Sequence, residues 1–201
     1  MEITTMDVIG PVLTDDEVKK CIITAQQLLE SMSDRTDLHS RSCLERFNDI
    51  VMGEIAELSV IKWIQNQGKF AQSAVDKSSG RPDCGHDIIL HSQDGNIIKC
   101  SVKSSLSALK SNAENIIDTF NLSSKKSEIQ GINIQVYFWL DLHGSPRVST
   151  PSNNNMAIIG WAGRKDLSGE KEGQYATETR PVVDFPLKKL RPMHSLLNIL
   201  E

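Results

Sequence analysis

The fold is decided by the stretch Gly85-His86-Asp87-Ile88-Ile89-Leu90, followed by Gln93-Asp94-Gly95-Asn96 and then by Ile97-Ile98-Lys99-Cys100-Ser101-Val102-Lys103-Ser104-Ser105. Two apolar runs flank a polar turn, so this stretch predicts two short strands joined as a hairpin. Side chains alternate between the faces of a strand, so Ser101 and Lys103 share one face and the apolar neighbours share the other. Asp87 opens the first strand. The hairpin therefore sets an aspartate beside a lysine, which suits a metal ion and a scissile phosphate.

Composition limits the class of protein. The chain has 201 residues, of which 39% are hydrophobic and 24% charged, as expected for one domain with a core and a solvated surface. No run approaches about 18 apolar residues and the first residues lack a signal pattern, so we expect no membrane contact and a cytoplasmic location. The cysteines lack CxxC spacing, which favours free buried thiols over a zinc site. They are Cys21, Cys43, Cys84 and Cys100.

Charge restricts how this chain can bind nucleic acid. The net charge is −4 and the sequence pI is about 5.8, whereas a general nucleic-acid coat is usually basic. DNA contacts must then use local basic patches or a dimeric cleft. The candidate patches are Lys125-Lys126, Arg164-Lys165 and Lys188-Lys189-Arg191. Each run on its own is more often an ordinary solvated surface.

The hydrophobic periodicity predicts helices and strands around the hairpin. A capping-box pattern at Thr14 and Glu17 begins one helix, and Gly68 can end another. The expected helices cover residues 14–31, 42–67, 106–120 and 191–200, and the expected further strands cover 70–75, 132–142 and 157–162. Polar loops are expected at 33–40, 77–85, 143–155 and 169–180. This order predicts an α/β fold with a central mixed β-sheet flanked by helices.

Asp87, Ser101 and Lys103 together resemble the motif of the PD-(D/E)xK nuclease superfamily, which includes the restriction endonucleases. The resemblance covers roughly positions 45 to 140, with thirteen residues between Asp87 and Ser101. The family usually has an acidic residue two positions before its lysine, where this chain has Ser101. Some restriction enzymes have a similar Ser-x-Lys pattern and borrow a glutamate from a helix. The resemblance implies a restriction-endonuclease-like core with an extra N-terminal helix.

The resemblance also implies a domain organisation. Residues 1–201 would form a single nuclease domain. Within it, residues 1–40 would be an N-terminal helical extension, residues 41–141 the catalytic core, and residues 142–201 the C-terminal strands and helix.

The family's chemistry can be carried over onto the hairpin. A strand aspartate and the backbone carbonyl between the acidic position and the lysine hold the metal in the family, and here these are Asp87 and the carbonyl of Val102. Lys103 would orient or deprotonate the attacking water, or stabilise the pentavalent phosphate. Ser101 would leave room for metal-bound water. The implied cofactor is Mg²⁺, with Mn²⁺ able to substitute, because hard cations prefer oxygen ligands.

Glu54 is the expected second carboxylate, as both a catalytic and a metal-binding residue. Its helical neighbours are apolar, so it should point toward a buried side, where a carboxylate is costly unless it is paired or bound to a metal. The family often carries a glutamate on the helix before its hairpin, and Gly53-Glu54 is similar to that motif. The alternative is a glutamate at the border of an amphipathic helix, salt-bridged to a neighbour. Other carboxylates compete for the role: Glu57, Glu114 and Asp118. Asp83, which follows Pro82, is the alternative to Asp87, which is preferred because the apolar strand begins directly after it.

The implied function is hydrolysis of phosphodiester bonds in double-stranded DNA by a metal-dependent endonuclease. A type II restriction enzyme is the most similar kind, and such enzymes usually act as homodimers on palindromes. Base contacts are expected from loop 143–155, which carries Arg147, and from the Arg164-Lys165 turn. One alternative is a non-catalytic DNA-binding or scaffold protein with a degenerate nuclease fold. Others are a structure-specific repair nuclease and an acyl-transfer enzyme with a Ser101/Lys103 dyad.

Overall fold

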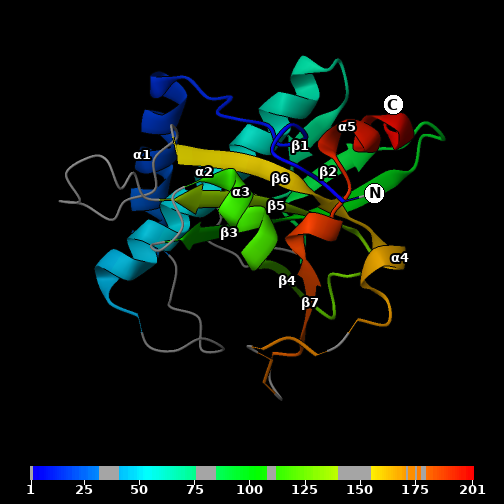
Figure 1. The fold of residues 1–201 in the computed structure, drawn as a ribbon. Coiled ribbons are helices and arrows are strands. Elements are labelled where there is room, and N and C mark those ends of the chain that lie inside the picture. Colours follow the sequence, from blue (N-terminus) through cyan, green and yellow to red (C-terminus); the bar gives the residue numbers. More distant parts are fainter. Residues whose placement is uncertain are drawn as a thin grey trace.

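A five-stranded mixed sheet forms the centre of the protein in a computed structural model (Figure 1). The structure describes residues 2–31, 41–75, 85–107, 112–139, 155–170, 172–174, 176–177 and 180–201. The strands lie in the order β1 (Ala71–Ser73), β2 (Ile88–His91), β3 (Ile97–Ser107), β5 (Ile132–Trp139) and β6 (Met156–Ala162). β3 and β5 are parallel, and the other neighbouring strands are antiparallel. The predicted α/β class with a central mixed sheet is therefore confirmed.

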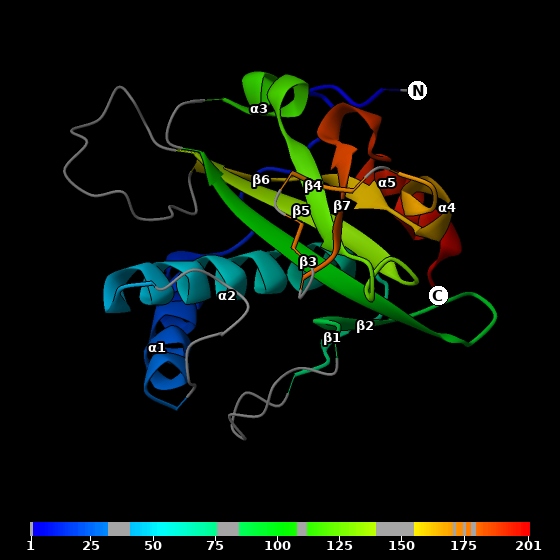
Figure 2. The same ribbon diagram turned by 90° about the horizontal axis from the view of Figure 1, so that it is seen from below.

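Different layers cover the two faces of this sheet (Figure 2). One face packs on the helices α1 (Asp15–Ser31), α2 (Cys43–Asn66) and α5 (Met193–Leu196), with the 3-10 turn η3 (Leu197–Ile199) following α5. The other face is covered by α3 (Ala113–Thr119), α4 (Arg164–Leu167), the 3-10 turn η2 (Leu187–Lys189) and a small antiparallel sheet of β4 (Asn121–Lys125) and β7 (Val182–Pro186). Each face thus has its own apolar cluster.

Local capping signals set the bounds of the long helices. The Ser42 backbone N–H donates to Glu45 (2.7 Å), and the Glu45 N–H donates back to the Ser42 hydroxyl (3.2 Å), which completes a capping box at the start of α2. Thr14 and Glu17 form the same reciprocal pair before α1. Gly68, at φ 74°, takes the left-handed conformation that ends a helix. The helices predicted over 14–31 and 42–67 are confirmed.

The alternation along β3 separates an apolar face from a polar one. Cys100 is fully buried in the cluster under α2, and Val102 packs against that cluster. Ser101 and Lys103 point to the opposite face, as the period of two requires. On the parallel neighbour β5, Gln135 is 1% exposed and lies on this same polar face. A buried polar layer is therefore built into the centre of the sheet, under β4 and β7.

Several predicted elements differ from the structure. Leu106 and Ser107 belong to β3, paired with Phe138 and Trp139, and not to a helix over 106–120. Pairing with the long strand β5 outweighs the local helical spacing, and the helix begins only after the N-cap at Asn112. The expected closing helix over 191–200 is one helical turn followed by a 3-10 turn. The strands β4 and β7 were not predicted.

The cysteines and the expected loops agree with the structure only in part. Cys21 and Cys100 are buried free thiols, but Cys43 is exposed because it lies in the first turn of α2. Cys84 and Asp83 lie outside the described residues, as do Arg147, loop 33–40 and most of the loops at 77–85 and 143–155. Within the described ranges, no helix has both the length and the apolar character needed to cross a bilayer.

Candidate functional site

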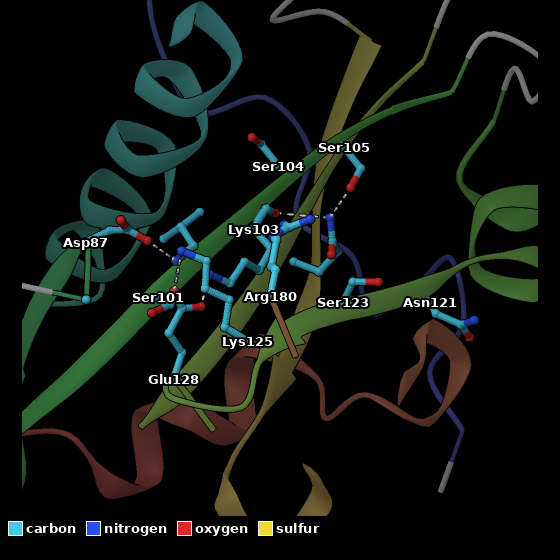
Figure 3. A pocket seen from close by; sticks show the side chains of 13 residues that line it. Asp87, Ser101, Lys103, Ser104, Ser105, Asn121, Ser123, Lys125, Glu128 and Arg180 are labelled. Carbon is cyan, nitrogen blue, oxygen red and sulfur yellow. Dashed lines mark hydrogen bonds and ion pairs between the residues drawn. The ribbon is translucent and has the colours of Figure 1, made fainter. Parts of the chain in front are cut away.

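A cavity of about 340 Å³ lies over the polar face of β3, beneath the small sheet of β4 and β7 (Figure 3). The residues that line it are mostly charged, hydroxyl or amide residues. They come from β3 and the residues before β2, from β4 and the turn after it, from β5 and from the segment before β7: Gly85, Asp87, Ser101, Val102, Lys103, Ser104, Ser105, Asn121, Ser123, Lys125, Glu128, Gln135 and Arg180. Asp87, Ser101 and Lys103, predicted as site residues, are brought together here.

Asp87 lies at the point where β2 begins and β3 continues beyond it. Its backbone N–H donates to the carbonyl of Cys100 (2.9 Å), and its Oδ2 accepts from the N–H of Val102 (2.7 Å). The N–H and C=O of one strand residue point toward the same neighbouring strand. The Val102 carbonyl therefore faces the same edge as the Asp87 carboxylate. The two oxygen donors of the predicted metal site therefore belong to the same side of β3.

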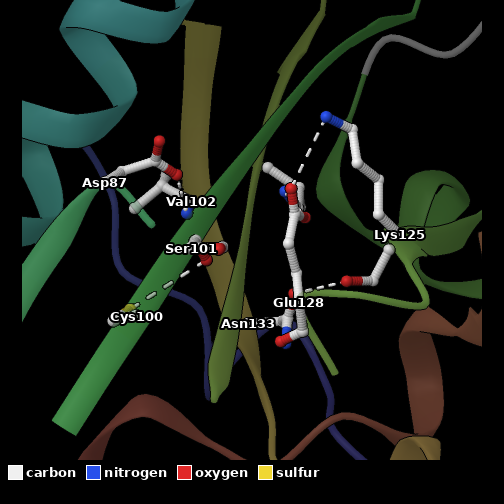
Figure 4. A network of polar contacts seen from close by, with 9 residues as sticks. Asp87, Cys100, Ser101, Val102, Lys125, Glu128 and Asn133 are labelled. Carbon is white, nitrogen blue, oxygen red and sulfur yellow. Dashed lines mark hydrogen bonds and ion pairs between the residues drawn. The ribbon is translucent and has the colours of Figure 1, made fainter. Parts of the chain in front are cut away.

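Lys103 is paired with a carboxylate that the sequence did not indicate. Its Nζ donates to Glu128 Oε2, and Lys125 Nζ lies 3.7 Å from Glu128 Oε1 (Figure 4). The Glu128 side chain is only 9% exposed. A carboxylate this deeply buried needs compensating charge, and the two lysines supply it.

Gln135 fixes the polar layer beneath the cavity. Its Nε2 donates to the carbonyl of Lys103 (3.0 Å) and to the hydroxyl of Ser105 (3.2 Å). Ser101, 4% exposed, lies on the same face of the neighbouring strand. A buried polar network that is satisfied in this way holds its side chains in one arrangement. The cavity therefore has a rigid floor.

Glu54 is not among the residues that line this cavity. It lines a second cavity of about 400 Å³ together with Lys20, Thr24, Glu57 and Ser73. The reason is topological, because α2 packs on the apolar face of the sheet whereas Ser101 and Lys103 project from the other face. Glu54 and its alternative Glu57 are therefore absent from the lining of the cavity that holds Asp87, Ser101 and Lys103.

The other predicted side chains also lie away from the cavity lining. Glu114 and Asp118 are exposed on α3, as expected of surface acids. Arg164 and Lys165 form the exposed first turn of α4 and do not line the cavity.

Sequence reasoning missed the residues contributed by β4 and the segments next to it. Glu128 lies in the turn after β4, and Arg180 lies before β7; neither has a local motif. Lys125 has a sequence signal only as part of the basic run Lys125-Lys126. The sequence offered one usable signal for this part of the cavity, which is the polar residue Ser123 near the centre of β4.

The electrostatic balance of the cavity differs from that of the whole chain. Three cations, Lys103, Lys125 and Arg180, face two carboxylates, Asp87 and Glu128, in a chain of net charge −4. A local excess of positive charge favours a ligand that carries negative charge.

The buried thiol of Cys100 lies against the opposite face of β3. Burial and the nearby Asp87 raise the pKa of this thiol above its usual range, so it stays protonated and chemically inert.

The donor atoms at this site suit a hard divalent cation. The described residues contain no cluster of three or more histidine, cysteine, aspartate or glutamate side chains that could hold a metal. Mg²⁺ does not need such a cluster, because it commonly uses one or two carboxylates, water and substrate phosphate oxygens. Asp87 and the Val102 carbonyl provide this kind of donor set. The residues therefore fit the cation that the family resemblance implies.

Comparison of the chain with protein-family models, with curated proteins and with solved structures finds no match.

Proposed function

We propose that this protein is a Mg²⁺-dependent endonuclease that hydrolyses phosphodiester bonds in double-stranded DNA. The observation that carries the proposal is the convergence of Asp87, Ser101 and Lys103 on one polar cavity where β2 begins and β3 continues beyond it. The order of elements from α2 to β5 also supports the proposal. A helix, three successive strands, a helix and a further strand follow one another as in the nuclease core that the motif resembles. The added strand β4 lies outside that order.

Each residue has a chemical task in the proposed reaction. Bound Mg²⁺ would neutralise developing negative charge and lower the pKa of a water molecule. Asp87 and the Val102 carbonyl would hold the cation, because both lie where β2 begins and β3 continues beyond it. Lys103 orients or deprotonates the attacking water, or stabilises the pentavalent phosphate. Ser101 leaves space for water because its side chain is short.

The substrate is inferred from charge and from the resemblance. Lys125 and Arg180 add positive charge at the rim of the reacting centre, where the phosphates of a DNA backbone would lie. Because the rest of the chain is acidic, DNA would be held close to the cavity and not over a broad surface. A homodimer would supply the two cavities needed to cut both strands of a palindromic site.

A pair of carboxylate variants tests the proposal. Asp87→Asn should slow cleavage of a labelled duplex in Mg²⁺ by at least about a hundredfold, because a metal-held reaction loses several kcal/mol of stabilisation. Glu54→Gln is the matched control, and it should cleave at close to the wild-type rate. Both variants should bind the duplex in Ca²⁺ as tightly as the wild type does. Loss of cleavage in Glu54→Gln with full activity in Asp87→Asn would contradict the proposed site.

Ser101 favours a second candidate function. This chain has Ser101 at the position where the family has an acid, and Lys103 is already paired with Glu128. Both features suit a nuclease-like fold that binds DNA without cutting it. Sequence-specific binding with no cleavage in Mg²⁺ or Mn²⁺ would favour this non-catalytic module. Cleavage of branched but not linear duplexes would instead indicate a structure-specific repair nuclease.

A further inference from the structure

We infer that Glu128 is the second metal-binding carboxylate of the site, in the place that the nuclease motif gives to an acid at position 101. The inference rests on the proposed function and assigns to it a residue that lies outside the motif. Glu128 comes from the turn between β4 and β5, about 25 positions after the hairpin lysine. Neither the catalytic hairpin nor the preceding helix provides it.

The first argument is geometric. Ser101 lies between the side chains of Asp87 and Glu128 in two different views (Figures 3 and 4), and all three residues line the same cavity. A longer acidic side chain at position 101 would project into this space from β3. A serine leaves the space open, and the Glu128 carboxylate approaches it from the opposite wall. The two positions are therefore alternative origins for one carboxylate.

The second argument is the way the Glu128 backbone is held. Its N–H donates to the carbonyl of Lys125 (2.9 Å), and its own carbonyl accepts from the Gly131 N–H (3.2 Å) and from Asn133 Nδ2 (3.2 Å). Asn133, itself fully buried, also accepts from the Ser124 hydroxyl. Metal sites need ligands that are fixed in this way by surrounding hydrogen bonds. An ordinary surface glutamate does not need such an anchor.

The third argument concerns charge. Without a metal, Lys103 and Lys125 neutralise the buried Glu128 carboxylate. A divalent cation between Asp87 and Glu128 would take over that task. Both ammonium groups would then be able to contact the phosphate of a bound substrate. Glu54 does not offer this exchange, because it lines the cavity on the other side of the sheet.

Metal binding, and not cleavage, is the sharpest test. Mn²⁺ would be titrated into metal-free protein without DNA, and free Mn²⁺ would be followed by electron paramagnetic resonance. Glu128→Gln and Asp87→Asn should each weaken binding by at least about tenfold to a hundredfold, because losing a residue that only supports a ligand already costs that much. Glu114→Gln, the same change on the exposed face of α3, should bind as the wild type does. Circular dichroism would establish that each variant is folded.

A relocated carboxylate distinguishes a ligand from a structural residue. Adding Ser101→Asp to Glu128→Gln should recover most of the lost Mn²⁺ affinity, since the acid would return from the β3 side. A purely structural role for Glu128 predicts no recovery, and that result would overturn the inference.

The outcomes separate this inference from the proposed function. Wild-type affinity in Glu128→Gln with weakened binding in Asp87→Asn would overturn the inference and leave the proposed nuclease standing. Full affinity in Asp87→Asn would overturn the metal site itself, and the role of Glu128 with it. Absence of Mn²⁺ binding by the wild type would overturn both.

Discussion

The ion pair between Lys103 and Glu128 allows a quantitative prediction from a double-mutant cycle. The Lys103 side chain is 22% exposed and that of Glu128 is 9% exposed, so the pair lies between a surface pair and a buried one. Exposed pairs contribute about 0.2–1 kcal/mol, and breaking a fully buried pair costs about 3–5 kcal/mol. Lys103→Met leaves Glu128 with Lys125 at 3.7 Å, which offsets part of the loss. We therefore expect Lys103→Met to reduce the free energy of unfolding by about 1–3 kcal/mol.

The interaction itself is measured by adding Glu128→Gln, alone and with Lys103→Met. The coupling free energy should be about 1–2 kcal/mol, because the double variant no longer leaves a buried carboxylate without its main partner. Urea unfolding followed by circular dichroism, in buffer containing a chelator, gives all the required values.

A second ion pair provides the matched control. Lys126 and Glu172 approach to 3.9 Å with side chains 51% and 65% exposed, so their cycle should give a coupling at or below the low end of the surface range. A Lys103–Glu128 coupling no larger than this control would refute the argument. It would mean that the pair does not hold Glu128 in the cavity in solution.

Two further predictions concern stability away from the site. A hydrogen bond and ion pair with Lys62 lower the pKa of Glu17 to about 2. The ionised Glu17 therefore contributes up to about 1 kcal/mol to the free energy of unfolding above pH 4.5, and this contribution fades as the pH falls toward 2. Glu17→Gln should remove that part of the acid sensitivity in urea unfolding, and an unchanged pH profile would contradict the prediction. A Cβ at Gly160 would lie 2.6 Å from the Arg191 carbonyl, whereas one at Gly53 in α2 meets nothing within 4 Å. Gly160→Ala should therefore destabilise the protein by about 1–3 kcal/mol, and Gly53→Ala should stabilise it by about 0.5–1 kcal/mol. Equal effects of the two variants on the melting temperature would count against the packing described here.

Local signals explain why much of the fold could be predicted. The capping box at Thr14 and Glu17 places the start of α1 to within a residue, because its hydrogen bonds join neighbours in sequence. The hairpin follows from its alternation and from Gly95, which adopts φ 74° in the turn. The shared face of Ser101 and Lys103 follows from the period of a strand. These features need no information from distant parts of the chain.

The rest of the site depends on contacts between distant segments. β4 forms by pairing with β7, and Ser123 donates to Asp184, 61 positions later. Glu128 becomes buried only because that small sheet covers the cavity. No periodicity in the sequence encodes these pairings, so both strands and their polar residues were missed.

The position of Glu54 depends on layer packing as well. Its place on an apolar stripe predicts that it faces inward, and the residue is half-buried in a cavity other than the one that Asp87 lines. The helix α1 and strand β1 bound its cavity, as the lining residues Thr24 and Ser73 show. A helical stripe reveals that a side is buried, and only the packing of layers decides which side of the sheet it meets.

The central claim is that Asp87 and Lys103 form the reacting centre of a DNA endonuclease. Incubation of a long duplex DNA with Mg²⁺ and the purified protein, beside the double variant Asp87→Ala, Lys103→Ala, tests this claim most directly. The account predicts discrete fragments from the wild type and intact DNA with the double variant. Intact DNA from the wild type with either Mg²⁺ or Mn²⁺, across several unmodified and modified duplexes, would contradict it.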